Sequence, residues 1–277
     1  MFEEAAAYHA RFKPQALLIA LQGRTVHESF GGGFDGEQPH ALFSGTKSFW
    51  GVAALVAQRE GLLELDERVS ETIDAWNADA WKRQVTLRQL LQLTAGIPFG
   101  GLGAGVPEYT KAIATELRNE PGTTFTYGGI PLQVFGAVLA RKLEARDSSP
   151  HRFLHERVLD PLDIAVAKWR TLRDGTHPLP TGAFMRARDW LAYGSYVLQK
   201  HQEFSECFRG SAANPRYGLA WWLAPPGAPG DAFYASGSGG QALYVIPSRE
   251  LAAVRFGSGG SFNHAAFLKR LAPANAP

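Results

Sequence analysis

Ser44 and Lys47 are the two residues whose types and spacing most directly suggest chemistry. They stand three residues apart at the start of an apolar stretch that predicts a buried helix ending at Gly61. Residues three apart share one helix face, so the hydroxyl and the amine can meet. An amine in an apolar site can take the hydroxyl proton and make the serine nucleophilic. The pattern is short enough to arise by chance, so other segments must support it.

Tyr127 is a second candidate for chemistry. Pro121 and Gly122 predict a turn, a short extended piece follows, and the tyrosine stands just before a helix predicted from Ile130. A phenol there could relay a proton if nearby cations favour its ionised form. The alternative is a ring that only packs in the wall of a cleft.

A glycine-rich run from Tyr234 to Gln241 stands between two predicted strands. Glycines would let a substrate lie against the strand edge, where backbone N–H groups serve as donors. The alternative is a flexible hairpin without a role in binding.

Strand patterns occupy both ends of the chain, and helical patterns lie between them. Helices are predicted over residues 2–12, 87–93 (with Thr86 as cap), 130–145, 150–158, 187–200 and 262–271, and strands over 16–21, 25–30, 217–223, 232–236, 241–246 and 251–256. This order predicts one sheet built from both termini, with an inserted helical lobe. We expect a single domain over residues 1–277. Its α/β lobe would cover about 1–60 and 213–277, and its helical lobe about 61–212.

Taken in this order, the serine–lysine pair, the tyrosine segment and the glycine-rich strand resemble the serine beta-lactamase and penicillin-binding-protein superfamily. The likeness is greatest to its class C-type branch, which includes esterases, D-amino-acid peptidases and 6-aminohexanoate-dimer hydrolases. It covers roughly residues 15–270, with supporting segments at 62–69, 85–97, 157–162, 183–190 and 217–222. The resemblance implies an α+β, beta-lactamase-like fold, in which an antiparallel sheet flanked by helices joins a helical lobe.

The resemblance also implies roles for individual residues. Ser44 would be the nucleophile, Lys47 its proton partner and Tyr127 a second proton relay. The oxyanion hole would be formed by the backbone N–H groups of Ser44 and Ser238, and a helix N-terminus at Ser44 would favour the developing anion. Further substrate contacts are expected from Gly129, Ser236, Gly237 and Gln241.

Two positions depart from the family pattern. The family often has Asn two residues after the tyrosine, whereas this chain has Gly129. The family strand motif often begins with Lys or His, whereas this chain reads Ala235-Ser236-Gly237. A cation at that point would pair with a substrate carboxylate. Its absence argues against penicillins and peptidoglycan stems as substrates.

Composition excludes several other classes. The 28 basic and 26 acidic residues give a net charge of +2 without a basic run, so nucleic acid is not expected as a partner. Cys207 is the single cysteine, which rules out an internal disulfide and a multi-thiolate metal site. His151 and His155 have helical spacing but no third ligand nearby, so neither a metal nor another cofactor is expected. The longest early apolar run is too short to span a bilayer.

These observations favour a serine hydrolase that acts through an acyl-enzyme on small-molecule esters or amides. Beta-lactamase or D-amino-acid peptidase activity is one alternative, and a non-catalytic binding protein with the same fold is another. The N-terminus lacks the pattern of a secretory signal, so a cytoplasmic location is expected, or a periplasmic or secreted one if a signal has been removed. The oligomeric state is left open.

Overall fold

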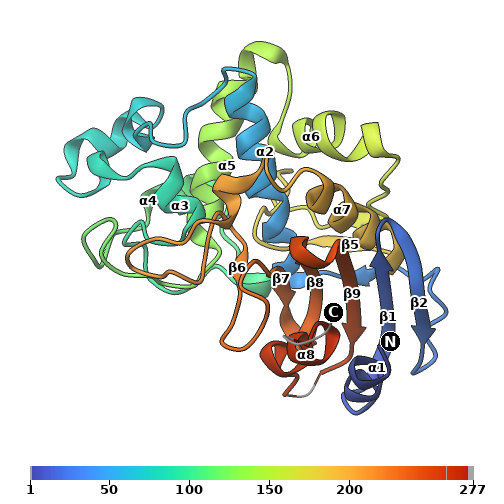
Figure 1. The fold of residues 1–277 in the computed structure, drawn as a ribbon. Helices are drawn as coiled ribbons and strands as arrows, with labels where there is room; N and C mark the ends of the chain where they lie inside the picture. The colour runs from blue at the N-terminus through green and yellow to red at the C-terminus, as the bar shows by residue number, and fades with distance from the viewer. Residues whose placement is uncertain (1, 260, 274–277) are drawn as a thin grey trace.

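The main sheet of the protein is antiparallel and has six strands, and it lies to one side of helices α2 (Ser48–Arg59) to α5 (Ile130–Leu143) in the computed structural model, which describes residues 2–259 and 261–273 (Figure 1). The spatial order of the strands is β2-β1-β9-β8-β7-β6. Their bounds are β1 Pro14–Leu21, β2 Arg24–Phe30, β6 Trp222–Leu223, β7 Phe233–Gly237, β8 Gln241–Ile246 and β9 Leu251–Gly257. The N-terminal strand β1 pairs with the C-terminal strand β9, so both ends of the chain build one sheet, as the sequence predicted.

Helices cover both faces of this sheet. Helices α1 (Glu3–Ala10) and α8 (His264–Leu271) pack on one face, where Leu17 and Ile19 of β1 join their apolar cluster. On the other face α7 (Ala187–Gln199) packs against β1, β8 and β9, and Leu18 of β1 belongs to that larger core. Successive side chains of a strand point to opposite faces, so a sheet covered twice needs apolar residues at nearly every position. This explains why all of β9 is buried.

The middle of the chain supplies most of the remaining helices. They are α2 (Ser48–Arg59), α3 (Leu87–Leu91), α4 (Tyr109–Ala114), α5 (Ile130–Leu143) and α6 (Pro150–Leu154). Thr86 caps α3 as predicted, because its hydroxyl accepts from the Gln89 N–H and the Gln89 side chain accepts from the Thr86 N–H. The α+β class and the antiparallel sheet flanked by helices are therefore confirmed. Within the described residues no helix is long and apolar enough to cross a membrane.

Two predicted elements differ in the structure, and one small sheet was not predicted. The strand expected over 217–223 is reduced to Trp222–Leu223, because Ala220 takes a left-handed φ of 63° and the Gly218 N–H bonds back to the Trp221 carbonyl. The helix expected over 150–158 changes at His155 into a π-helical turn that runs to Leu159. The sequence also missed a small second sheet of β3 (His40–Ala41), β5 (Ala183–Met185) and β4 (Lys168–Trp169).

The helix α7 lies inside the range predicted for the helical lobe, and yet it packs on the six-stranded sheet. The division into two lobes stays a prediction.

Candidate active site

Ser44 lies on a 3₁₀ helix, η1 (Phe43–Lys47), that runs directly into α2. The sequence predicted one continuous α-helix, but the tighter turn places residues i and i+3 above one another. Ser44 and Lys47 are therefore closely aligned. Phe43, directly before the serine, has a φ of 48° and is 40% exposed. A left-handed φ is costly for a residue with a side chain, so the backbone is strained next to the candidate nucleophile.

Lys47 is only 1% exposed, and its amine points at the serine. The Nζ atom lies 2.9 Å from Ser44 Oγ and donates to the Pro180 carbonyl at 3.2 Å. It also lies 5.0 Å from the centre of the Tyr127 ring. Burial lowers the pKa of Lys47 to about 7, since the charged form loses its hydration. A large part of the lysine is therefore neutral at neutral pH and able to accept a proton.

The segment that carries Pro180 is fixed by two buried side chains. The Trp50 indole donates to the Leu179 carbonyl at 2.6 Å, and the Gln133 side chain accepts from the Leu179 N–H at 2.8 Å. Gln133 also donates to the Pro107 carbonyl. Trp50 belongs to α2 and Gln133 to α5, so two helices hold the carbonyl that contacts the lysine. The sequence analysis missed Pro180, because a backbone acceptor 133 residues away leaves no pattern.

Tyr127 stands beside the same serine. Burial raises the pKa of Tyr127, and a hydrogen bond to Ser44 opposes this only in part. The phenol therefore stays protonated at neutral pH, and the cation-favoured phenolate considered from the sequence is not what the structure supports. Trp222 stacks on the Tyr127 ring at 5.6 Å and 23°, and Tyr217 meets it edge-on at 6.3 Å. Of the tryptophan pair 221–222, Trp221 is buried in the core and Trp222 faces the tyrosine.

The second side of the site is the strand β7 and the turn after it. Gly237 lies so close to the Leu42 carbonyl that a Cβ would overlap it, which brings the strand end against the segment leading to Ser44. The neighbouring strand β6 pairs only with Phe233 and Tyr234, so no described strand pairs with Ala235–Gly237 along that edge. Ser236 is partly exposed, and Ser238 is exposed. We call Ser44, Lys47 and Tyr127 the nucleophile side, and Ala235, Ser236, Gly237 and Ser238 the strand side.

Gln241 does not offer its side chain to a substrate in this structure. Its amide nitrogen donates to the carbonyls of Ser238 and Gly257, and its amide oxygen accepts from the Gly257 N–H at 2.9 Å. The fully buried Arg255 donates to the carbonyls of Gly239 and Gly240 at 3.1 and 2.7 Å. Both side chains thus fix the turn that carries Ser238. The amide supports this turn with both of its N–H groups and one lone pair of its oxygen, and its expected contact with a substrate stays a prediction.

A family model described as Beta-lactamase matches residues 11–274. The chain belongs to the beta-lactamase family. Similar solved structures include a family VIII carboxylesterase (16% identity, TM-score 0.74, covering 98% of this chain and 96% of the other), a D-stereospecific amidohydrolase from Streptomyces sp. (15%, 0.75, 100% of each) and a beta-lactamase from Mycobacterium bovis (20%, 0.70, 96% of each). They confirm the beta-lactamase-like fold.

A curated relative, Protein flp of Staphylococcus aureus (strain MW2), is 29% identical over 136 residues, which is 45% of this chain. The chain spans only about a quarter of that protein, since the match covers 27% of its length.

Both departures from the beta-lactamase family pattern have a structural counterpart. A Cβ at Gly129 would overlap the Gly101 carbonyl and approach Pro180 Cγ to 2.9 Å, so the position has no room for an amide side chain. The Gly129 N–H is also used, because it donates to the Gly100 carbonyl at 2.8 Å. Ala235 is 2% exposed and belongs to the main core cluster. The strand side of this family member therefore carries no cation at the position where the family often has one.

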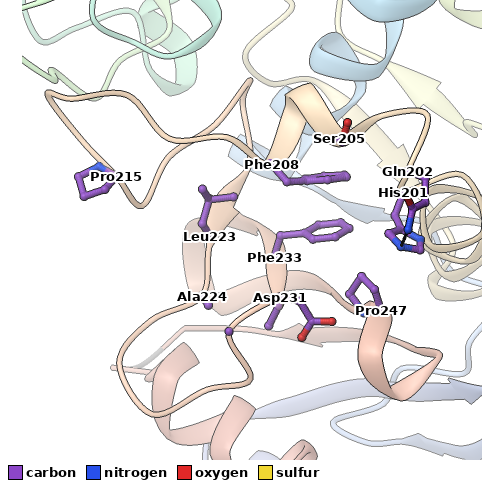
Figure 2. Close-up of a pocket in the computed structure, with 12 residues that line it drawn as sticks. His201, Gln202, Ser205, Phe208, Pro215, Leu223, Ala224, Asp231, Phe233 and Pro247 are labelled. Atoms are coloured by element: carbon purple, nitrogen blue, oxygen red, sulfur yellow. Dashed lines mark hydrogen bonds between the residues drawn. The ribbon is translucent and has the colours of Figure 1, made fainter.

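A separate cavity of about 460 Å³ lies beside β6 and β7, and Figure 2 shows the side chains around it. The rings of Phe208 and Phe233 stack there with centres 3.6 Å apart. No member of the nucleophile side or the strand side lines it. The lining residues are His201, Gln202, Ser205, Phe208, Pro215, Leu223, Ala224, Gly230, Asp231, Ala232, Phe233 and Pro247.

Histidines 151, 155 and 177 lie close together, with ring centres 4.6 Å apart for the first two and 4.0 Å apart for His151 and His177. Across the described ranges no group of three or more His, Cys, Asp or Glu side chains has an arrangement that could hold a metal ion.

Proposed function

We propose that this protein is a serine hydrolase that cleaves esters or small amides through an acyl-enzyme on Ser44. The observation that carries the proposal is the 2.9 Å contact between Ser44 Oγ and a buried lysine whose pKa is lowered to about 7. A serine is a weak nucleophile until a neighbouring base takes its proton. Membership of the beta-lactamase family supports the proposal, as do structural neighbours described as a carboxylesterase and an amidohydrolase.

The proposed reaction begins when neutral Lys47 takes the Ser44 proton and Oγ attacks the substrate carbonyl carbon. The electron pair of the C=O bond moves to oxygen, and the backbone N–H groups of Ser44 and Ser238 stabilise this anion. The bond to the leaving group then breaks. The leaving group takes a proton from the Tyr127 phenol. The proton held by Lys47 then moves to the tyrosine oxygen. Water then gives a proton to Lys47 and attacks the acyl carbonyl carbon, the bond from that carbon to Ser44 Oγ breaks, and Oγ takes the proton back from Lys47 as the acid leaves.

The two-lobe organisation is part of this proposal. Ser44 and Lys47 come from the first stretch of the predicted α/β lobe, Tyr127 from the predicted helical lobe, and Ser238 from the C-terminal stretch. The site would then depend on how the inserted helices meet the sheet.

Beta-lactam or D-amino-acid peptide hydrolysis is the second candidate, because the same nucleophile side would serve it. The uncharged strand side favours neutral esters and amides instead, since Ala235 provides no partner for a carboxylate.

Covalent labelling tests the proposal directly. A fluorophosphonate probe should add one adduct to the wild-type protein by intact mass, and Ser44→Ala should add none while keeping its melting temperature. The control is Ser205→Ala, which removes an exposed hydroxyl at the separate cavity and should label like the wild type. Labelling that persists in Ser44→Ala, or an unlabelled wild type, would contradict the assignment and favour a binding protein without catalysis.

A further inference from the structure

A chain of three hydrogen-bonded side chains links the strand side to the C-terminal helix. Ser236 Oγ lies 3.0 Å from His264 Nε2, and His264 Nδ1 lies 2.6 Å from the Tyr244 hydroxyl. Tyr244 sits on β8 directly opposite Tyr234 of β7, and His264 is the first residue of α8. Asn263 caps that helix by accepting from the Ala266 N–H, which fixes the histidine at the helix start.

The position of the proton in each of these two hydrogen bonds follows from which group is able to donate. Burial raises the pKa of Tyr244 well above 10, so its hydroxyl keeps its proton. Among the residues that the structure describes, the Tyr244 hydroxyl has one hydrogen-bond partner, His264 Nδ1. If Nδ1 carried a proton, the fully buried phenol proton would have no acceptor, which is costly. The phenol must therefore donate to Nδ1.

The second imidazole nitrogen then has its role fixed as well. Burial and the nearby Arg255 lower the pKa of His264 to about 4, so the neutral ring carries one proton at neutral pH. With Nδ1 accepting, that proton is on Nε2, which donates to Ser236 Oγ. The serine oxygen is thus occupied as an acceptor from the protein. Its own proton has no acceptor among the described residues, and Ser236 lies on the part of β7 that β6 leaves unpaired.

We propose that Tyr244 and His264 orient Ser236 as a hydrogen-bond donor for an uncharged carbonyl oxygen of the substrate, apart from the carbonyl that is attacked. The substrate class is then esters or amides that carry a second, neutral carbonyl group. The substrate class rests on the proposed hydrolase function. The direction of the hydrogen bonds from Tyr244 to Ser236 does not depend on it. His264 acts through Ser236 and is a positioning residue.

The direction of the hydrogen bonds from Tyr244 through His264 to Ser236 can be measured without a substrate. Protein labelled with ¹⁵N-histidine should show His264 as the neutral Nε2–H tautomer at pH 7, with its signals assigned by their loss in His264→Gln. Tyr244→Phe removes the donor to Nδ1 and should allow the other tautomer to appear. A wild-type His264 protonated on Nδ1 would overturn the proposal.

The effect on substrates calls for a matched pair of esters. The p-nitrophenyl esters of 4-oxopentanoate and pentanoate share a leaving group and differ by one carbonyl. A single hydrogen bond is worth about 2- to 12-fold, so kcat/KM should favour the oxo ester by this factor, mainly through KM. Ser236→Ala and His264→Leu should each remove the preference. His264→Gln, which keeps an N–H near the place of Nε2, should retain much of it.

A double variant separates positioning from general damage. In the Ser236→Ala background, His264→Leu should change the oxo-ester preference no further, because its effect passes through the serine. The proposal is overturned if the wild type shows no preference, or if His264→Leu slows both esters in equal proportion. Failure of the proposed function would look different, since Ser44 would then remain unlabelled and neither ester would be cleaved.

Discussion

The nucleophile side and the strand side of the site differ in what they present to a substrate. The nucleophile side places an ionisable amine, Lys47, within 2.9 Å of the serine oxygen and adds the protonated phenol of Tyr127. The strand side presents neutral groups, and the buried cation Arg255 of β9 donates to the carbonyls of the turn after β7. The contrast suggests that proton transfer and substrate choice are separable. Variants of the first side should change kcat, and variants of the second should change which substrate is preferred.

The largest expected effect comes from Lys47. Lys47→Arg keeps a cation but cannot accept a proton, so kcat/KM for p-nitrophenyl butyrate should fall by about 10⁴-fold, the upper end for general base catalysis. In the wild type the base must be neutral, and its pKa is about 7. Activity should therefore rise as pH increases through about 7 and level off above it. The rate measured from pH 5 to 9 checks this limb, which should vanish in Lys47→Met. Near-normal turnover by Lys47→Arg would remove the lysine from the mechanism.

The second prediction also concerns the nucleophile side and uses the variant Tyr127→Phe. The ring and its stacking on Trp222 remain, while the hydroxyl proposed to protonate the leaving group is lost. We expect kcat to fall by about 10²–10³-fold with little change in KM. The matched control is Tyr217→Phe, which removes a buried hydroxyl from the ring that packs edge-on against Tyr127 and should keep near wild-type kcat. If both variants behave alike, Tyr127 is a packing residue.

The smallest effect concerns the strand side. Loss of a charge-assisted hydrogen bond costs about 10- to 150-fold in kcat/KM. The wild type should therefore cleave p-nitrophenyl butyrate better than nitrocefin, whose carboxylate lacks a partner at Ala235. Ala235→Lys should narrow this gap more than Ala235→Met, a neutral side chain of similar length. Ala235 is buried, so melting temperatures must be compared for both variants. Faster turnover of nitrocefin than of p-nitrophenyl butyrate would contradict the predicted preference for neutral esters.

The sequence predicted what depends on near neighbours in the chain. The spacing of Ser44 and Lys47, the cap at Thr86 and the apolar runs of the terminal strands are all local patterns, and each has its counterpart in the structure. The resemblance then joined segments far apart in the chain. The roles assigned to these residues remain proposals until the variants are measured.

What the sequence could not predict depends on where distant groups meet. Gln241 follows the glycine-rich run and looked like a substrate contact, but the carbonyls of Ser238 and Gly257 occupy its amide. The apolar run 217–223 looked like a strand, but α2 approaches so closely that Gly51 lies against the Leu219 carbonyl, and the chain turns there. Arg255 and His264 could have been noticed as polar residues in apolar segments, although their partners could not.

The carbonyl of Pro180 gives the lysine a contact that does not depend on its charge. A carbonyl oxygen can accept from an ammonium and from a neutral amine, so the 3.2 Å bond from Nζ can persist throughout a catalytic cycle. The bond to Ser44 must instead reverse, because the ammonium donates to Oγ and the neutral amine accepts from it. One contact is thus a constant anchor while the other changes direction. Trp50 and Gln133 keep that anchor in place, so hydrogens can be exchanged while the nitrogen and its surroundings stay where they are.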